Sequence, residues 1–549
     1  MLKIGIKKLK KYYGERLLLD IEKLQVYKGD RIGVVGINGV GKTTLLEIIN
    51  RDISYDSGYL FIDKDTIIKY VSQLKEPNRK KISGKYASIF QVPDRWTYSM
   101  SGGEKTRFKL AEGFENKGSL MLVDEPTSNL DIEGIELITK NFKEYSDTFM
   151  VVSHDRNFLD NVCNKILEIE NGKAKLYKGN YSKYIELKEE EVARKEFEYE
   201  QYVKEKKRLT NLKGNIKEQS SQVRTTPKRM GNSEARLHKM GGQVNKEKLD
   251  NFAKSVESRI NHLEKKEKPV ENNAIKIEIS DSSKPHSKVL VSGDKIDKAY
   301  GENIIFKNTK FDIYNGKKVA LIGPNGSGKT TLIKMILNKE YINISENVRI
   351  GYFSQSLDIL DENKTILENV METSIHDETF VRIVLARLLI SGDKVYEKLE
   401  ILSGGERVKV SFAKMILTDI NLLILDEPTN YLDISSLEVI EDLLINYTGT
   451  VLLVSHDSRF IKNIAEELLI IENHKIKKFK GNYTEYSKRK KEPKLNTQEK
   501  AKQEEIMLLE IEVSSLLSKI SFEENQENKK ELDKKYKIKL KELQELKEK

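Results

Sequence analysis

Two glycine-rich stretches place a lysine and a threonine at the same spacing. GINGVGKT covers residues 36–43 and GPNGSGKT covers 323–330, and both fit the pattern G-x-x-x-x-G-K-[ST]. Glycines let the backbone curl so that its N–H groups face phosphate oxygens, and the helix that follows presents its positive N-terminus to them. We therefore expect both stretches to bind nucleotide phosphates, with the two lysines at the β- and γ-phosphates. The predicted nucleotide contacts are Gly36, Ile37, Asn38, Gly39, Val40, Gly41, Lys42, Thr43 and Thr44, and Gly323, Pro324, Asn325, Gly326, Ser327, Gly328, Lys329, Thr330 and Thr331.

An aspartate and a glutamate end an apolar run in each half of the chain. LMLVDE holds Asp124 and Glu125, and LLILDE holds Asp426 and Glu427. An aspartate at the end of a buried strand is suited to hold Mg²⁺ from its outer coordination sphere, and the next glutamate can polarise the attacking water. Glu125 and Glu427 are therefore predicted to be catalytic, with ATP and Mg²⁺ as cofactors. The predicted magnesium-binding residues are Thr43, Gln73, Asp124, Thr330, Gln355 and Asp426.

A histidine and a glutamine recur at fixed places around these motifs. His154 and His456 stand in SHD, and they suit the sensing of a γ-phosphate as further catalytic residues. A single histidine is usually structural, but the order of the motifs around these two favours the functional interpretation. Gln73 and Gln355, in YVSQ and YFSQ, precede an SGGE sequence and are placed where a glutamine can contact Mg²⁺ and water.

A tyrosine precedes a glycine upstream of each glycine-rich stretch. Tyr13 and Tyr300 are predicted to stack on adenine. The alternative is that both pack in the protein core.

The elements that must position these residues occur twice. GDRIGVVGINGVGKTTLL recurs as GKKVALIGPNGSGKTTLI, SGGEKTRFKLA as SGGERVKVSFA, LMLVDEPTSNLD as LLILDEPTNYLD, and VVSHDRNFL as LVSHDSRFI. The order is kept, which indicates duplication of a whole domain. Short β-branched runs that alternate with longer amphipathic stretches predict an α/β domain with parallel strands and ligand loops at the strand C-termini.

Between the copies and after the second copy the composition becomes densely charged. Apolar residues at helical spacing predict a helical hairpin between the domains, with Tyr202, Leu209, Leu212 and Ile216 on one helix and Leu249, Phe252, Val256, Ile260 and Leu263 on the other. A second pair of apolar seams predicts a small C-terminal hairpin. One seam consists of Ile506, Leu509, Val513, Leu516 and Ile520, and the other of Leu532, Tyr536, Leu540 and Leu543. The predicted division is 1–188, 189–272 with a tip near 220–245, 273–489, and 490–549.

Composition narrows the classes of protein. The net charge of +10 is explained equally well by a polyanionic partner and by a composition that is simply rich in lysine. The single cysteine, Cys163, excludes a disulfide framework or an iron–sulfur cluster built within the chain. No run approaches the roughly 18–20 apolar residues that cross a bilayer, so a cytoplasmic location is expected.

The motif order, from glycine-rich stretch through glutamine, SGGE and DE to SHD, resembles the ABC ATPase superfamily over nearly all of 1–190 and 287–487. This resemblance implies that each SGGE contacts a nucleotide bound to the opposite domain, through intramolecular pairing that needs no other protein subunit. The first site then combines Lys42, Gln73, Glu125 and His154 with Ser403, Gly405 and Glu406. The second site combines Lys329, Gln355, Glu427 and His456 with Ser101, Gly103 and Glu104.

The chain resembles the ABC-F family in its two fused cassettes, the glutamate in SGGE, the sequence DEPTNYLD and the charged helical linker. Gln73 lies 28 positions before Ser101, against 48 between Gln355 and Ser403, so the first domain is trimmed where housekeeping translation factors of the family carry an added arm. Segments such as KTILENV and LARLLISGDKVYEKLEILSGGERVKV resemble the Vga-type antibiotic-resistance members. SNLD at 128–131 departs from the usual NHLD and leaves the equivalence of the two sites open.

The predicted hairpin tip is basic. Five basic side chains and one acidic side chain lie within 220–245, which suits RNA binding, whereas a flexible basic turn is the alternative. The resemblance puts this tip near the peptidyl-transferase centre. The predicted ribosome and tRNA contacts are Arg224, Lys228, Arg229, Met230, Arg236, Leu237, His238 and Lys239.

The resemblance implies an ATP-hydrolysing ribosome-protection factor. Such a factor binds the exit site of the bacterial 70S ribosome, near 23S rRNA and P-site tRNA, and displaces lincosamides, pleuromutilins and streptogramin A. A housekeeping translation factor that relieves stalled ribosomes is the first alternative. The ATPase subunit of an exporter is the second.

Overall fold

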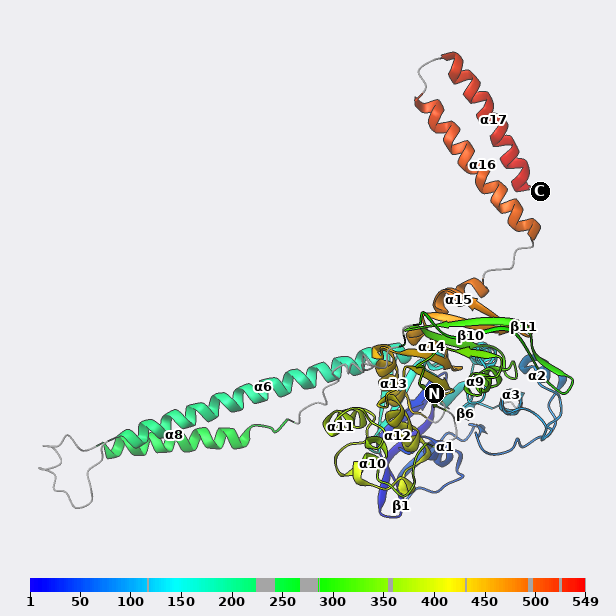
Figure 1. The fold of residues 1–549 in the computed structure, drawn as a ribbon. Helices are drawn as coiled ribbons and strands as arrows, with labels where there is room; N and C mark the ends of the chain where they lie inside the picture. Colours follow the sequence, from blue (N-terminus) through cyan, green and yellow to red (C-terminus); the bar gives the residue numbers. More distant parts are fainter. Residues whose placement is uncertain are drawn as a thin grey trace, which may run out of the picture. The chain divides into compact units, whose positions relative to one another are not determined.

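The computed structural model describes residues 1–115, 118–223, 242–266, 285, 287–353, 359–429, 432–491, 497–522 and 526–548. The chain forms two compact units, Met1–Lys480 and Gly481–Lys549. The first unit contains both copies of the duplicated domain and the charged linker between them, and Figure 1 shows the course of the chain.

Each copy is built on a six-stranded sheet, and the two sheets have the same strand order. The order is β5-β6-β7-β3-β8-β9 in the first copy and β14-β15-β16-β12-β17-β18 in the second. All neighbours are parallel except the last pair. The strands are β5 (Ile68–Val71), β6 (Leu120–Asp124), β7 (Thr148–Val152), β3 (Arg31–Val35), β8 (Lys165–Glu170) and β9 (Lys173–Lys178), then β14 (Ile350–Phe353), β15 (Leu422–Asp426), β16 (Thr450–Val454), β12 (Lys318–Ile322), β17 (Glu467–Glu472) and β18 (Lys475–Phe479).

A three-stranded antiparallel sheet accompanies each large sheet. It has the order β2-β1-β4 in the first copy and β11-β10-β13 in the second. The strands are β1 (Leu2–Tyr13), β2 (Arg16–Tyr27), β4 (Ser57–Ile62), β10 (Val289–Tyr300), β11 (Asn303–Tyr314) and β13 (Ile342–Ile344). The predicted α/β class with two tandem nucleotide-binding domains is confirmed.

Strand β6 illustrates why the central strands are apolar throughout. Leu120 and Leu122 pack into one hydrophobic core, while Met121 and Val123 pack into another. Successive side chains of a strand point to opposite faces, so a strand covered on both faces needs apolar residues at every position.

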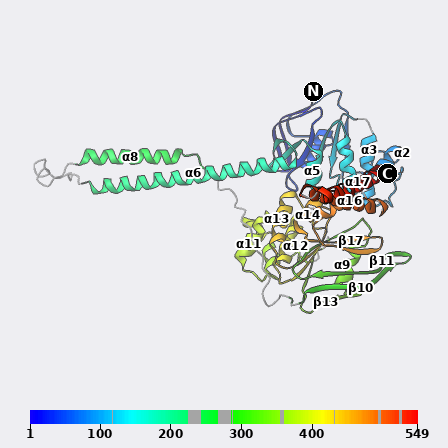
Figure 2. The same ribbon diagram turned by 90° about the horizontal axis from the view of Figure 1, so that it is seen from above.

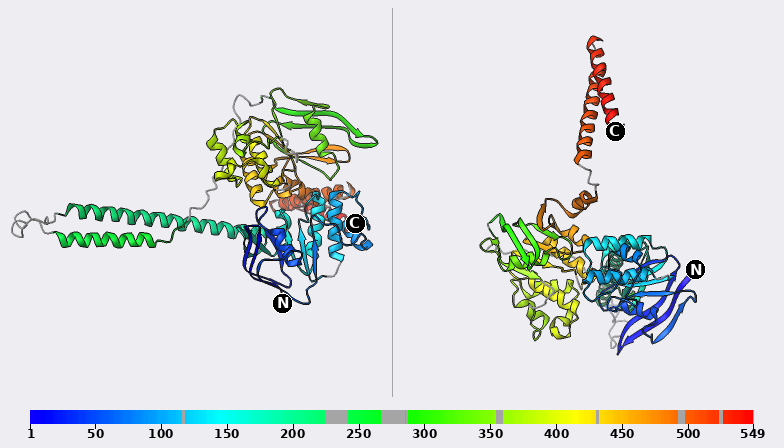
Figure 3. Two further views of the ribbon diagram at one scale, coloured as in Figure 1. Left: turned by 90° about the horizontal axis from the view of Figure 1, so that it is seen from below. Right: turned by 90° about the vertical axis from the view of Figure 1, so that its right-hand side faces the viewer.

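The helices follow the strands and begin close to the predicted motifs. In the first copy they are α1 (Lys42–Asn50), α2 (Gly84–Phe90), α3 (Gly102–Glu115), α4 (Ile132–Glu144) and α5 (Arg156–Val162). In the second they are α9 (Lys329–Leu337), α10 (Ile366–Met371), α11 (Glu378–Arg387), α12 (Gly404–Ile416), α13 (Ile434–Asn446) and α14 (Ser458–Ile464), with the short 3-10 helices η2 (Gly392–Tyr396) and η3 (Leu399–Ile401). Figure 3 shows the two domains next to each other.

The linker forms the predicted pair of helices, α6 (Tyr181–Gln222) and α8 (Gln243–His262). They lie side by side in Figures 1 and 2. Their shared core contains Leu209, Ile216, Ala253 and Val256, with Leu212, Leu249, Ile260 and Leu263 partly buried around it.

The predicted seam was wrong at one position of α8. Phe252 is 50% exposed, and Ala253 takes the inward place. Leu249, Ala253, Val256 and Ile260 follow alternating steps of four and three residues, which keeps one face toward a partner helix. Phe252 lies one residue off that face, and the small alanine lets the two helices approach. Tyr202 is half-buried beside Tyr199.

The second unit consists of helices α15 (Tyr483–Lys491), α16 (Thr497–Phe522) and α17 (Gln526–Glu548). Helices α16 and α17 pack on each other. Val513 and Leu543 are buried, and the other residues of the two predicted seams are half-buried. The division of the chain at 188, 272 and 489 stays a prediction.

Candidate functional site

Each glycine-rich stretch connects a central strand to a helix. The loop after β3 leads into α1 and the loop after β12 leads into α9. Gly41 and Gly328, the residues before these helices, have φ values of +101° and +103°. This left-handed conformation is accessible to glycine at little cost, and a Cβ on Gly41 would also lie 2.9 Å from Leu19 Cδ2.

The two loop lysines bind the carbonyls of their own loops. Lys42 Nζ donates to Gly36 O at 2.7 Å and to Ile37 O at 3.1 Å. Lys329 Nζ makes the matching contacts with Gly323 O at 2.9 Å and Pro324 O at 3.1 Å. Burial lowers the pKa of both ammonium groups, against the effect of nearby carboxylates.

Two of the three predicted magnesium residues of the first copy, Thr43 and Asp124, are adjacent. Thr43 Oγ1 donates to Asp124 Oδ2 at 2.9 Å, and Asp124 is buried at the end of β6. Burial raises the pKa of Asp124 and of Asp426, while hydrogen bonds from Thr43 and Thr330 oppose that rise. A hydroxyl and a carboxylate beside a phosphate loop are oxygen donors of the kind that Mg²⁺ prefers, and its remaining ligands are usually water and phosphate. The donor set therefore fits the ion.

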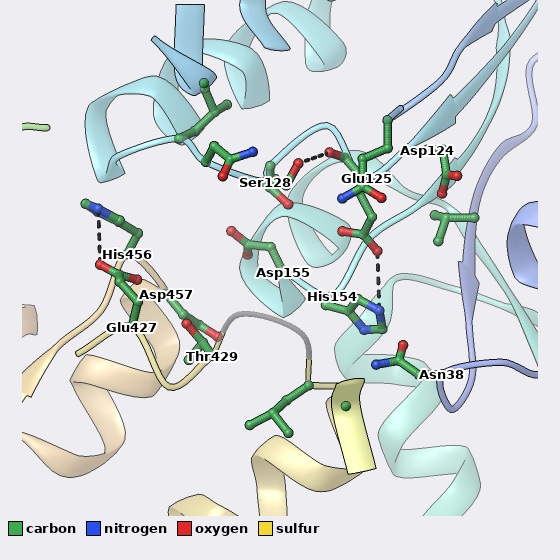
Figure 4. Close-up of a pocket in the computed structure, with 18 of the residues that line it drawn as sticks. Asn38, Asp124, Glu125, Ser128, His154, Asp155, Glu427, Thr429, His456 and Asp457 are labelled. Carbon is green, nitrogen blue, oxygen red and sulfur yellow. Dashed lines mark hydrogen bonds and ion pairs between the residues drawn. The ribbon is translucent and has the colours of Figure 1, made fainter. Parts of the chain in front are cut away.

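Each predicted catalytic glutamate lies against the predicted histidine of its own domain (Figure 4). His154 Nε2 is 3.4 Å from Glu125 Oε1, and His456 Nε2 is 3.2 Å from Glu427 Oε1. Burial raises the pKa of Glu125 to about 8 and that of Glu427 to about 7. Burial also lowers the pKa of His154 to about 3 and that of His456 to about 4, so both imidazoles are neutral at pH 7.

Both glutamates hold a left-handed backbone conformation. The φ values are +50° at Glu125 and +52° at Glu427. Each N–H donates at 2.9 Å to a carbonyl of the neighbouring strand, at Val152 and Val454 respectively. A non-glycine residue in this region carries about 1–3 kcal/mol of strain, and such residues cluster at functional sites.

The SGGE glutamates cap their own helices. Glu104 Oε2 accepts from Ser101 N and Oγ, both at 2.8 Å, and Glu406 does the same with Ser403 at 3.0 and 2.8 Å. Glu406 also pairs with Lys394 of η2. Burial opposes ionisation of Glu406, but the Lys394 and Ser403 hydrogen bonds lower its pKa to about 2.

One cavity of about 1010 Å³ joins motifs of both domains. It reaches the first phosphate loop together with the second SGGE, and the first SGGE together with the second phosphate loop. The predicted residues that line it are Asn38, Gly39, Gly41, Lys42, Thr43, Thr44, Gln73, Ser101, Gly103, Asp124, Glu125, His154, Asn325, Gly326, Gly405, Glu427 and His456. The two motif sets are therefore brought together across the domain interface.

Two aspartates at this interface were missed from the sequence. Asn325 N donates to Asp131 Oδ2 at 3.1 Å, and Asn38 N donates to Asp433 Oδ2 at 3.5 Å. Asp131 and Asp433 end the repeated DEPT…LD segments. Their recurrence at matching positions was the available signal.

The remaining predicted residues lie outside the cavity or outside the described residues. Tyr13 and Tyr300 are 51% and 56% exposed, with Lys11 and Lys298 over their rings at 5.5 Å. They are therefore not core residues. Gln355 and all eight predicted tip contacts lie outside the described residues.

No helix in the described ranges is long and apolar enough to cross a membrane. The same part of the chain holds no group of three or more His, Cys, Asp or Glu side chains that could bind a metal ion.

Comparison with known proteins gives relatives that extend along the chain. The ABC transporter family model matches residues 19–96 and 306–430. Ribosome protection protein VmlR of Bacillus subtilis (strain 168) is 34% identical over 546 residues, which is 95% of this chain and 94% of that protein. Erythromycin resistance ATP-binding protein MsrA of Staphylococcus epidermidis is 33% identical over 464 residues, or 82% and 93% of the two chains.

Among solved structures, RNase-L Inhibitor superposes with a TM-score of 0.58. The match has 19% sequence identity and covers 88% of this chain and 93% of that chain. At this identity the likeness supports the twin-domain fold alone.

Proposed function

Because the chain belongs to the ABC-F family of ATP-binding cassette proteins and is an ATPase, we propose that it protects bacterial ribosomes from antibiotics bound at the peptidyl-transferase centre. The observation that carries the proposal is the 34% identity to a ribosome protection protein along 95% of the chain. The proposed drugs are lincosamides, pleuromutilins and streptogramin A, as in the Vga-type members. Action on ribosomes also implies a cytoplasmic location.

The proposed engine is closure of the two domains around two ATP molecules. Asn38 and Asn325, in the two phosphate loops, already contact Asp433 and Asp131 of the opposite domain. Mg²⁺, when bound at Thr43 and Asp124 and at Thr330 and Asp426, neutralises phosphate charge. Glu125 and Glu427 then orient and polarise the attacking water, and the neutral histidines hold the glutamates in place.

Each proposed ATP site is completed by the SGGE of the other domain. The N-terminus of α12 faces the first site through Gly404 and Gly405, which line the shared cavity, and the N-terminus of α3 faces the second site through Ser101 and Gly103. Helix N-termini attract phosphate oxygens, so a γ-phosphate in either site draws the two domains together. Hydrolysis removes this attraction and lets the factor leave the ribosome.

The proposed drug-displacing element is the end of the linker hairpin. Helix α6 has 42 residues, and a helix of that length extends roughly 63 Å. The far end of α6 is proposed to point toward the peptidyl-transferase centre when the protein is in the exit site, and the segment 220–245 is proposed to act there. There the basic residues of this segment neutralise rRNA or P-site tRNA phosphates.

The test is capture on ribosomes. The double variant Glu125→Gln, Glu427→Gln binds ATP but cannot activate water, so we expect it to co-sediment with 70S ribosomes in ATP and much less in ADP. The matched control Lys42→Ala, Lys329→Ala lacks both phosphate-binding ammonium groups and is expected to remain in the supernatant. Co-sedimentation no better than that of the wild-type protein would disprove the ribosomal function.

A second experiment tests the antibiotic part of the proposal. Wild-type protein is expected to restore cell-free translation in the presence of a lincosamide, a pleuromutilin or streptogramin A, with unchanged drug accumulation in expressing cells. Ribosome capture without any gain in tolerance would instead identify a housekeeping translation factor. Lower drug accumulation would identify an exporter subunit.

A further inference from the structure

Arg156 is the largest fully buried side chain of the described residues, and it crosses from one domain to the other. It is 1% exposed at the start of α5 in the first domain. Its Nη1 donates to Glu441 Oε2 at 3.2 Å, and its Nη2 forms a close ion pair with Glu441 Oε1. The same Nη2 lies 3.7 Å from Asp457 Oδ2. Both carboxylates belong to the second domain.

Asp457 follows His456, so Arg156 contacts the loop that carries the histidine of the second site. Asp457 caps α14 by accepting from Arg459 N at 2.8 Å and from Phe460 N at 3.0 Å. Its own N–H donates to Ser455 Oγ at 3.0 Å. The side chain of Asp457 thus joins the histidine loop, the start of α14 and the guanidinium of the opposite domain.

Among the described residues the first site has no equivalent arrangement. SHDR at 153–156 corresponds to SHDS at 455–458, so Ser458 stands where Arg156 stands in the other copy. The counterpart of Glu441, the eighth residue of α13, is Thr139, the eighth residue of α4. Ser458 accepts a single hydrogen bond from Asn157 at 3.2 Å. Within the described ranges Asp155 forms no ion pair across the interface.

The charges around Arg156 make its position depend on domain contact. Asn463 Nδ2 donates to Glu441 Oε2 at 3.0 Å. The carboxylates of Glu441, Asp457, Asp155 and Glu438 all interact electrostatically with Arg156, and the guanidinium of Arg459 also acts on Glu438. A planar, bidentate guanidinium fixes carboxylates in one geometry, which an ammonium cannot do. If the domains separate, Glu441 and Asp457 lose their counter-charge and the histidine loop loses this constraint.

We propose that Arg156 is a positioning residue for the second ATP site alone, holding the His456 loop in its hydrolytic position only while the two domains are in contact. The first site, where Ser458 takes the place of the arginine, hydrolyses without this requirement. The two ATP sites are therefore unequal in their dependence on domain closure. This inference rests on the ATPase activity of the family and does not depend on the ribosome.

The test separates the two sites by inactivating one at a time. In a Glu125→Gln background only the second site hydrolyses, and in a Glu427→Gln background only the first site does. Arg156→Ser is expected to lower kcat by about tenfold to a hundredfold in the first background, as a misplaced catalytic group does. Its KM for ATP should change little, and kcat in the second background should stay within about twofold. Asn157→Ala removes the neighbouring contact to Ser458 and the hydrogen bond that Asn157 Oδ1 accepts from Asn161 Nδ2, but no contact of Arg156; it is the matched control and should leave both rates unchanged.

Two further variants separate positioning from a loss of stability. Arg156→Lys keeps the charge without the bidentate geometry and should give an intermediate second-site kcat. Arg156→Ser with Glu441→Gln removes one of the two carboxylates that Arg156→Ser leaves without a counter-charge, so Tm should recover in part while the second-site kcat stays low. A kcat that recovers together with Tm would show that Arg156 serves stability alone and would overturn the inference. So would an equal loss of kcat in both backgrounds, or no loss in either.

A measurement without nucleotide completes the test. The chain has seven histidines, so the His154 and His456 imidazole resonances can be assigned by single substitutions. Arg156→Ser should shift the His456 resonances and leave those of His154 in place. Equal shifts at both histidines, or none at either, would contradict the assignment of Arg156 to the second site.

Discussion

The backbone N–H of Asn325, in the phosphate loop of the second domain, donates a 3.1 Å hydrogen bond to the carboxylate of Asp131 in the first domain. The other oxygen of that carboxylate caps α4 by accepting from Gly134 N at 2.9 Å. The Asp131 side chain thus caps the N-terminus of α4 in its own domain and binds the phosphate loop of the other domain. The reciprocal contact, from Asn38 N to Asp433, is longer at 3.5 Å.

We expect Asp131→Ser to separate these two roles. Serine caps helices about as well as aspartate, so Tm should change little, but its shorter side chain does not reach Asn325. The loss of a hydrogen bond to a charged group is worth about 1.5–3 kcal/mol, and it should appear as weaker ATP binding at the second site. Equilibrium titration with a fluorescent ATP analogue in a Lys42→Ala background measures that site.

Asp131→Ala is the companion variant because it removes the cap as well. It should lose about 1 kcal/mol of folding stability in addition, measured as a lower Tm. The same affinity for Asp131→Ser and wild-type protein would mean that the Asn325 contact does not support ATP binding.

The sequence was informative where function depends on short local motifs. The loops at Lys42, Glu125 and His154 were predicted correctly to follow the ends of strands, because each motif contains its own strand, turn and helix start. It was least informative about contacts between domains. Asp131, Arg156 and Glu441 each contact the opposite domain. The spacing of motifs within one copy does not tell which side chain of the other copy a residue contacts.

The linker shows a second limit. Helical spacing alone allowed both Phe252 and Ala253 to face α6, and hydrophobicity favoured the phenylalanine. The alanine is buried because two helices pack closely where a small side chain separates them, a preference that depends on the partner helix and not on the sequence of α8 alone.

We expect Leu209→Ala to weaken the linker hairpin without affecting the ATP sites. Leu209 is 3% exposed in the core shared by α6 and α8, and removing a buried leucine side chain costs about 2–5 kcal/mol. Hydrogen exchange of the α8 amides should become faster, while ATPase activity should stay at the wild-type level. Phe252→Ala is the matched control on the same rod, because its side chain is half exposed and its loss should change stability by no more than about 0.5 kcal/mol. If Leu209→Ala and Phe252→Ala accelerate hydrogen exchange equally, Phe252 packs against α6 as the sequence predicted.

The pKa shifts predict how stability changes with pH. Burial raises the pKa of Glu125 to about 8, and those of Glu427 and Asp155 to about 7. A carboxyl with a raised pKa in the folded state keeps a proton that the unfolded chain releases. Its contribution to stability is therefore full below the unfolded pKa and is lost as pH rises through the folded pKa.

Tm of the nucleotide-free protein should accordingly fall as pH rises from about 6.5 to about 8. Below that window the histidines act in the opposite direction, because burial lowers their pKa values and the unfolded chain takes up protons that the folded state does not. The variant Glu125→Gln, Glu427→Gln should show a shallower decline within the window, because the raised pKa values of Asp155 and Asp457 remain. Parallel Tm curves for the two proteins would show that these glutamates are ionised at neutral pH.

The exposed tyrosines upstream of the phosphate loops are predicted to stack on adenine, and their surroundings are alike in both domains. Tyr13 and Tyr300 each lie next to the glycine of a β-turn, each is about half exposed, and each has a lysine ammonium 5.5 Å from its ring centre. Stacking of a base on an aromatic ring is worth about 1–3 kcal/mol when measured by alanine substitution. Tyr13→Ala should weaken ATP binding to the first site by that amount, in a Lys329→Ala background, and Tyr300→Ala should do the same at the second site. Tyr13→Phe and Tyr300→Phe keep the aromatic face and should retain the wild-type affinity. If phenylalanine weakens binding as much as alanine does, the hydroxyl and not the ring makes the contact; if neither substitution changes the affinity, adenine binds elsewhere.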